Sequence, residues 1–180
     1  MPLSLVGSEM CIRDSCYRDA IIDKGVRFDG LFGPAYKGIP LATSVAMAFA
    51  EADQDYPLSF NRKEVKTHGE GGLLLGAPLM GQILAIDDVV TAGTAVRESF
   101  KFISNYGATL SSFCVAVDRQ ERGQDGSGSA LSELADLFSL TPISIVTLDD
   151  ILAFTSDDPR FASNVAPRID AYRSQYGALI

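Results

Sequence analysis

Short apolar runs alternate with longer stretches of helical character along this chain. The apolar runs indicate buried strands, and the longer stretches indicate amphipathic helices. The predicted strands span residues 28–32, 57–61, 83–86, 110–117 and 143–147. The predicted helices span residues 39–52, 94–106, 130–138 and 165–176, and residues 17–24 close an earlier helix. This alternation predicts an α/β fold with a mainly parallel central sheet flanked by helices.

Glycine-containing polar segments separate these elements. Gly25 and Gly107 each follow a predicted helix, where the left-handed conformation of glycine suits the helix end. Residues 62–72 are charged and end in glycines, so we expect a mobile loop there. Residues 73–75 and 79–82 are expected to form a hairpin around this loop, with the turn between them.

The chain has 180 residues, which at about 150 residues per domain predicts a single domain, expected over residues 16–180. Residues 1–15, MPLSLVGSEMCIRDS, lack the basic start and long apolar stretch of a signal peptide. They are similar to translated sequencing adapter at the ends of shotgun-derived sequences. We therefore expect a non-native leader, with a genuine short helix start as the alternative.

Charge and cysteine usage exclude several classes of protein. The formal net charge is −8, whereas nucleic-acid binders usually present a basic face. Cys11, Cys16 and Cys114 form no CxxC pair and no metal-ligand spacing, which favours a reducing, cytoplasmic setting. No apolar run approaches the roughly 20 residues that span a bilayer, so we expect no membrane partner.

The strongest chemical signal is the segment from Leu84 to Thr94, LAIDDVVTAGT. Asp87 and Asp88 end a predicted strand, and a turn of small and hydroxyl residues leads into a helix. Such a turn offers backbone N–H groups and the positive end of a helix dipole to a phosphate. The carboxylates can accept hydrogen bonds from neighbouring ribose hydroxyls. The alternative is a plain helix cap, which is how we interpret the similar pair Asp149 and Asp150, where the Thr-x-Gly-Thr turn is missing.

A second cluster places cations on the expected loop. Arg62, Lys63, Lys66 and the single histidine, His68, lie within seven residues of one another. Cations on a closing loop can stabilise a departing diphosphate. The alternative is a solvated charged loop, but the chain is acidic elsewhere, so the concentration of cations here favours a functional role.

The acidic pair and its turn resemble the ribose-phosphate motif of the type I phosphoribosyltransferases, which use 5-phosphoribosyl 1-diphosphate as donor. The resemblance implies that Asp87 and Asp88 hold the ribose hydroxyls and that the turn cradles the 5-phosphate. The donor-binding residues it implies in this segment are Asp87, Asp88, Val89, Val90, Thr91, Ala92, Gly93, Thr94 and Ala95.

The cationic loop resembles the mobile loop of the orotate phosphoribosyltransferases within that family. The resemblance implies that Lys66 is the main catalytic cation and that Arg62, Lys63 and His68 assist at the diphosphate. It also implies a homodimer in which each loop reaches into the neighbouring subunit.

Two further stretches agree with this family. Residues 31–40, LFGPAYKGIP, resemble its diphosphate-binding turn, with Tyr36 and Lys37 meeting the diphosphate. Residues 117–123, VDRQERG, resemble the stretch whose first arginine, here Arg119, binds the orotate carboxylate; Thr91 would also contact orotate. A plain turn and a surface ion pair of Arg119 with Asp118 or Glu121 are the respective alternatives.

The resemblance implies transfer of ribose 5-phosphate to orotate, giving orotidine 5′-phosphate and diphosphate in pyrimidine (UMP) biosynthesis. Mg²⁺ is the implied cofactor, held mainly through the substrate with no direct protein ligand. The resemblance begins at Cys16, and the family's amino-terminal orotate-binding region has no counterpart before it. A non-catalytic module that senses 5-phosphoribosyl 1-diphosphate and a purine-base transferase remain alternatives, although Arg119 argues against a purine.

Overall fold

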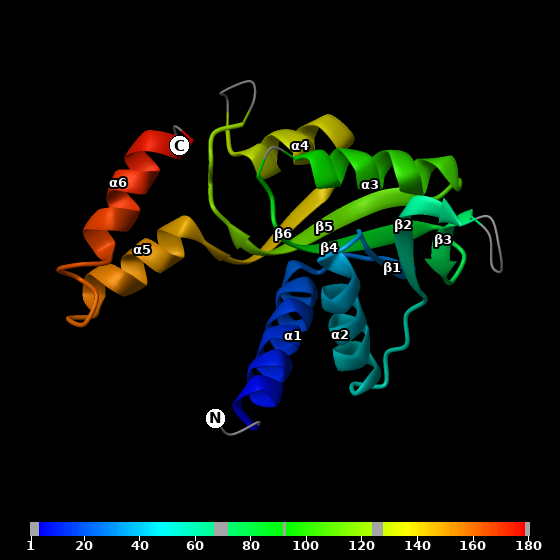
Figure 1. The fold of residues 1–180 in the computed structure, drawn as a ribbon, viewed down its shortest axis with the longest axis horizontal. Coiled ribbons are helices and arrows are strands. Elements are labelled where there is room, and N and C mark those ends of the chain that lie inside the picture. Colours follow the sequence, from blue (N-terminus) through cyan, green and yellow to red (C-terminus); the bar gives the residue numbers. More distant parts are fainter. Residues whose placement is uncertain (1–3, 67–71, 92, 124–127, 179–180) are drawn as a thin grey trace.

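The computed structural model describes residues 4–66, 72–91, 93–123 and 128–178. It contains one sheet with the strand order β3-β2-β1-β4-β5-β6 (Figure 1). The strands are β1 (Gly30–Gly33), β2 (Leu58–Lys66), β3 (Gly72–Gly76), β4 (Gln82–Val89), β5 (Thr109–Asp118) and β6 (Thr141–Thr147). Every neighbouring pair is parallel except β2 and β3, which are antiparallel. The predicted α/β fold with a mainly parallel sheet is therefore confirmed.

Two layers of helices cover the sheet. The helices are α1 (Ser4–Lys24), α2 (Gly38–Ala50), α3 (Thr94–Asn105), α4 (Ala130–Phe138), α5 (Leu148–Asp157) and α6 (Ala166–Tyr176). Figure 1 shows α3 and α4 on one face, α1 and α2 on the other, and α5 and α6 projecting beyond β6. No helix in the described ranges has both the length and the apolarity that a membrane span requires.

The central strand β4 supplies both layers of the core. Ile83 and Ala85 belong to the cluster beneath α3 and α4, whereas Leu84 and Ile86 belong to the cluster beneath α1 and α2. This follows from the pleat of a strand, which sends successive side chains to opposite faces. Leu84 is fully buried, which stabilises the fold by about 1.5–3 kcal/mol.

Local sequence explains where the helices begin and end. The Ser129 side chain accepts from the Ser132 N–H at the start of α4, and Thr147 and Asp150 form a capping box at the start of α5. This confirms the interpretation of Asp149 and Asp150 as a helix start. Gly25 and Gly107 follow α1 and α3 with positive φ, as predicted.

Three expectations about strands are wrong. The polar segment at residues 62–66 is not a loop, because β2 continues to Lys66 and pairs with β3. Residues 79–81 form no strand; the chain turns at Gly81, where φ is +67°, and β4 begins at Gln82. The hairpin partner of β3 is therefore β2. The predicted first strand is also displaced, since β1 begins at Gly30.

Candidate active site

Two carboxylates mark the carboxyl end of the central strand β4. Asp87 is 8% exposed, and the Asp88 side chain is 36% exposed. In parallel sheets ligands bind beyond the carboxyl ends of the strands, and β4 lies between β1 and β5, so the site is flanked on both sides. The pair therefore lies where the sequence predicted a ribose-binding site.

Asp87 is held by its neighbours. Its Oδ1 accepts from the Asp88 N–H at 2.9 Å, and its backbone carbonyl accepts from the Tyr17 hydroxyl at 2.8 Å. Burial raises the pKa of Asp87 to about 6. The carboxyl group is consequently ionised for the most part above neutral pH and available to accept hydrogen bonds from a sugar. Tyr17 was missed by sequence analysis because nothing local connects it to a residue 70 positions away.

Asp88 instead faces a cation. Lys37 Nζ lies 2.8 Å from Asp88 Oδ2, and the Val89 N–H donates to Asp88 Oδ1 at 2.9 Å. Partial burial opposes ionisation, but these two donors together outweigh it and hold the pKa of Asp88 below its usual range. The same contact raises the pKa of Lys37. The structure thus joins two residues that were predicted from separate motifs.

The turn that carries Lys37 is compact. A Cβ atom at Gly38 would lie 2.4 Å from Pro34 Cδ and 2.7 Å from the Ile86 carbonyl, so only glycine fits. The Ala35 N–H donates to Asn61 Oδ1 at 2.8 Å, which ties the turn to β2. The exposed Tyr36 ring lies 5.2 Å from Lys63 Nζ. Tyr36, Lys37 and Lys63, all predicted to meet a diphosphate, are therefore neighbours.

The phosphate turn follows directly from β4. Val90 is buried, Thr91 and Thr94 are exposed, and Ala95 is partly buried at the start of α3. Gly93 has φ of +73° and is the N-cap of α3. The backbone N–H groups of the first helical turn have no acceptor within the helix and can bind an anion. Ala92 lies outside the described residues. Each described hydroxyl of the predicted turn is accessible to a ligand.

The cationic segment differs from expectation. Arg62, Lys63 and Lys66 lie in β2 rather than in a loop, because this polar stretch pairs with β3. Arg62 is partly buried, and Lys63 is exposed. For Lys66 only the backbone is described, and His68 lies outside the described residues. The structure brings Lys63 next to Tyr36 in the turn before α2, and the roles of Lys66 and His68 stay predictions.

Arg119 follows β5, the strand beside β4. Its Nη2 lies 3.2 Å from Glu121 Oε1, so one of the alternative ion pairs foreseen for this residue is present. The Tyr172 hydroxyl of α6 donates to the same carboxylate and has a raised pKa because of this hydrogen bond. Sequence analysis missed Tyr172, since no motif surrounds it.

A pocket of about 270 Å³ lies between the phosphate turn and the segment after β5. Its lining includes Thr91, Arg97, Glu121, Arg122, Glu133 and Leu134. Thr91 and Glu121, the ion-pair partner of Arg119, therefore border the same hollow. Arg119 itself is not among the lining residues, so contact of Thr91 and Arg119 with the base stays a prediction.

The described residues contain no group of three or more His, Cys, Asp or Glu side chains that could hold a metal ion. The acidic pair alone can supply oxygen ligands, directly or through water. Mg²⁺ takes few protein ligands and retains waters when it binds with phosphates, so this donor set fits a Mg²⁺ ion held mainly by a diphosphate substrate.

Comparisons with known proteins agree with this geometry. Orotate phosphoribosyltransferase of Cronobacter sakazakii is 48% identical over 172 residues, which are 95% of this chain and 80% of that protein. The crystal structure of orotate phosphoribosyltransferase from Francisella tularensis superposes with a TM-score of 0.79 at 30% identity, covering 94% of this chain and 81% of the other. No protein-family model matches the chain.

A more distant structure shares the fold. Orotate phosphoribosyltransferase of Mycobacterium tuberculosis in complex with 5-phospho-alpha-D-ribosyl 1-diphosphate has a TM-score of 0.62 at 17% identity, covering 79% of this chain and 75% of that one. At this identity the likeness concerns the fold alone. The relatives of higher identity extend over most of both chains, and the chain therefore belongs to the orotate phosphoribosyltransferase family.

Proposed function

We propose that this chain transfers ribose 5-phosphate from 5-phosphoribosyl 1-diphosphate to orotate, giving orotidine 5′-phosphate and diphosphate in pyrimidine (UMP) biosynthesis. The observation that carries the proposal is the meeting of Asp87, Asp88 and Lys37 beside the Gly93 turn at one end of the sheet. The sugar, the diphosphate and the 5-phosphate of the donor would each have a complementary group there. The family to which the chain belongs supports the same reaction.

The donor would bind across three elements. Asp87 and Asp88 would accept from the ribose hydroxyls, since both carboxyl groups are ionised for the most part above neutral pH. The N–H groups that start α3, with Thr91 and Thr94, would hold the 5-phosphate. Lys37 would exchange part of its contact with Asp88 for the diphosphate. The M. tuberculosis relative of the same fold was crystallised with this donor.

Orotate would lie over the phosphate turn, with its carboxylate on Arg119 and its ring near Thr91. The guanidinium presents paired N–H donors that match a planar carboxylate. Attack by an orotate ring nitrogen would invert the anomeric carbon. Because the transition state has oxocarbenium character, the main catalytic task is to stabilise the leaving diphosphate.

The cations of β2 would perform that task. We assign Lys66 as the main catalytic cation, with Arg62, Lys63 and, beyond the end of β2, His68 assisting, and with this segment supplied across a homodimer. Closure of the segment would exclude water, which would otherwise hydrolyse the activated sugar. When bound, Mg²⁺ supplies neutralising charge to the diphosphate and ribose oxygens.

We place the enzyme in the cytoplasm. Cys16 and Cys114 are free thiols, and Cys114 is buried, which suits a reducing compartment. A sensor without catalysis would use the same carboxylates and phosphate turn, but it would have no need of Arg119. The relatives described above are named as enzymes, and a purine base would leave Arg119 without a carboxylate to pair.

The test follows orotate absorbance after the chain is mixed with 5-phosphoribosyl 1-diphosphate and Mg²⁺. The expected result is a Mg²⁺-dependent loss of the orotate signal, which Asp88→Asn abolishes and Asp157→Asn does not. Asp157 is an exposed carboxylate at the end of α5 and serves as the matched control. Donor binding by calorimetry without any orotate loss would favour the sensor.

A further inference from the structure

The segment after β5 is held from outside by α6. The Tyr172 hydroxyl donates to Glu121, and the Glu121 carboxylate accepts from Arg119 Nη2 at 3.2 Å and 3.3 Å. Tyr172 and Glu121 are 51 residues apart, so the contact exists only because α6 returns to the end of β5. The helix thereby reaches the guanidinium through a single intermediate carboxylate.

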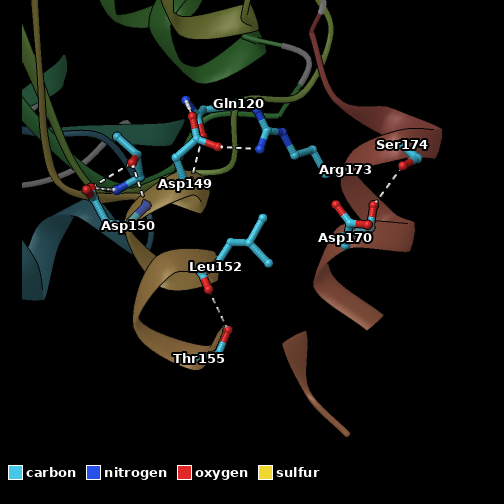
Figure 2. A network of polar contacts seen from close by, with 9 residues as sticks. Gln120, Asp149, Asp150, Leu152, Thr155, Asp170, Arg173 and Ser174 are labelled. Carbon is cyan, nitrogen blue, oxygen red and sulfur yellow. Dashed lines mark hydrogen bonds and ion pairs between the residues drawn. The ribbon is translucent and has the colours of Figure 1, made fainter. Parts of the chain in front are cut away.

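A second chain of contacts runs beside the first (Figure 2). Gln120 Nε2 donates to Asp149 Oδ2 at 3.0 Å, the Asp149 N–H donates to Gln120 Oε1 at 2.9 Å, and Arg173 Nη1 lies 2.9 Å from Asp149 Oδ1. Arg173 follows Tyr172 in α6, so adjacent residues of one helix brace adjacent residues of the segment.

The backbone is fixed as well. The Arg122 N–H donates to the Tyr176 carbonyl at 2.8 Å, and the Ala178 N–H donates to the Gln120 carbonyl at 2.9 Å. Backbone hydrogen bonds thus fix the position of the segment independently of the Tyr172–Glu121 contact, which reaches the Arg119 side chain through the Glu121 carboxylate. Removal of one hydroxyl should therefore leave the segment in place.

Arg119 retains donor capacity. Its Nε is buried and has no hydrogen-bond partner within the described part of the chain. A buried donor without a partner is costly, and native structures usually satisfy it. The ion pair with Glu121 uses Nη2 and leaves the remaining N–H groups for a second carboxylate.

We propose that Glu121, oriented by the Tyr172 hydroxyl of α6, is a positioning residue that holds the Arg119 guanidinium for the orotate carboxylate. This rests on the proposed function, in which Arg119 binds that carboxylate. Glu121 fixes one nitrogen of the fork, and Tyr172 keeps Glu121 from rotating away. The C-terminal helix thus sets how strongly the site distinguishes a base with a carboxylate from one without it.

The test compares two nucleotides that differ only in the carboxylate. Dissociation constants of orotidine 5′-phosphate and uridine 5′-phosphate are measured by calorimetry, which requires no turnover. Tyr172→Phe is expected to weaken orotidine 5′-phosphate binding about fivefold, as the loss of one hydrogen bond implies, with uridine 5′-phosphate unchanged. Glu121→Ala should weaken it further, and Glu121→Gln, which keeps an acceptor oxygen, should restore part of the loss.

Tyr176→Phe is the matched control. Tyr176 lies one turn further along α6, and its hydroxyl makes no hydrogen bond within the described part of the chain, so both affinities should stay at the wild-type values. Tyr172→Phe should also have no further effect in an Arg119→Ala background.

The outcomes separate the inference from the proposed function. Equal weakening of both nucleotides, or a lowered melting temperature with both affinities unchanged, would assign Tyr172 a structural role and overturn the inference alone. If Arg119→Ala left the preference for orotidine 5′-phosphate intact, the orotate role of Arg119 and the inference would fail together. If orotidine 5′-phosphate did not bind the wild-type chain, the proposed function itself would be refuted.

Discussion

Gly93 is the position in the phosphate turn where the addition of a single methyl group is expected to destabilise the protein most. Its φ is +73°, and a Cβ atom built there would lie 2.4 Å from Leu134 Cδ1. Leu134 is 2% exposed and packed in the core, so it has little room to move. Gly93→Ala therefore combines backbone strain with overpacking at the N-cap of α3.

The magnitude follows from these two contributions. An L-residue in the left-handed region costs about 1–2 kcal/mol, and overpacking of a well-filled core costs about 1–3 kcal/mol. We expect Gly93→Ala to lower the free energy of unfolding by about 2–5 kcal/mol. Gly107→Ala is the matched control, because Gly107 has φ of +79° with nothing within 4 Å of its built Cβ. The Gly107→Ala variant should therefore be destabilised by the backbone strain alone.

Urea unfolding of both variants and calorimetry with ribose 5-phosphate make the comparison. Gly93→Ala should be the less stable variant and should bind ribose 5-phosphate more weakly, whereas Gly107→Ala should bind as the wild type does. Equal destabilisation of the two variants would show that Leu134 yields freely, and the packing argument would be wrong. Unchanged ligand binding by a folded Gly93→Ala protein would refute the role of this turn in holding the 5-phosphate.

Three further substitutions probe the charges of the site. Lys37→Ala should let the pKa of Asp88 rise toward its usual range, visible in a carboxyl NMR titration, and should weaken donor binding. Burial raises the pKa of Asp87 from 3.8 to about 6, so the folded state binds this proton more tightly than the unfolded chain does. The stability that this proton contributes to the protein is lost as the pH rises through 6. Asp87→Asn should thus be more stable than wild type at pH 8 by about 1–3 kcal/mol, equal to it near pH 4, and impaired in turnover, as urea unfolding and the orotate assay would show. Lys66→Ala should slow turnover far more than it weakens donor binding, and the exposed Lys101→Ala serves as the control. If donor affinity fell as much as the rate, Lys66 would bind the ground state and the transition state equally, and its catalytic assignment would fail.

Sequence analysis recovered the elements whose determinants are local. The helix predicted at residues 130–138 has the bounds of α4, whose apolar periodicity lies within the helix and whose N-cap, Ser129, directly precedes it. The end of β2 was not recovered. Residues 62–66 are polar and charged, and their strand conformation comes from pairing with β3, a contact that local composition does not encode.

The candidate site also contains residues that the local sequence identifies and residues that it does not. Asp87 and the Gly93 turn were recognisable because strand, carboxylates and helix start are consecutive in the chain. The Lys37–Asp88 contact joins residues 51 positions apart, and the sequence supplied both partners without supplying their pairing. Tyr17 and Tyr172 have no local motif, and their contacts depend on the packing of α1 beside β4 and of α6 beside the segment after β5.

The positions that work against stability converge on one end of β4. Asp87 is a buried carboxyl whose burial disfavours its charge, and Gly93 holds a left-handed conformation against a core leucine. The four residues before them, Ile83 to Ile86, are buried and apolar, and they stabilise both faces of the sheet. A strand that served packing alone would continue this apolar pattern, and local exceptions of this kind are expected at functional sites. Under the proposed function the carboxylates and the turn meet a charged sugar phosphate, and the apolar half of the same strand stabilises the fold enough to tolerate them.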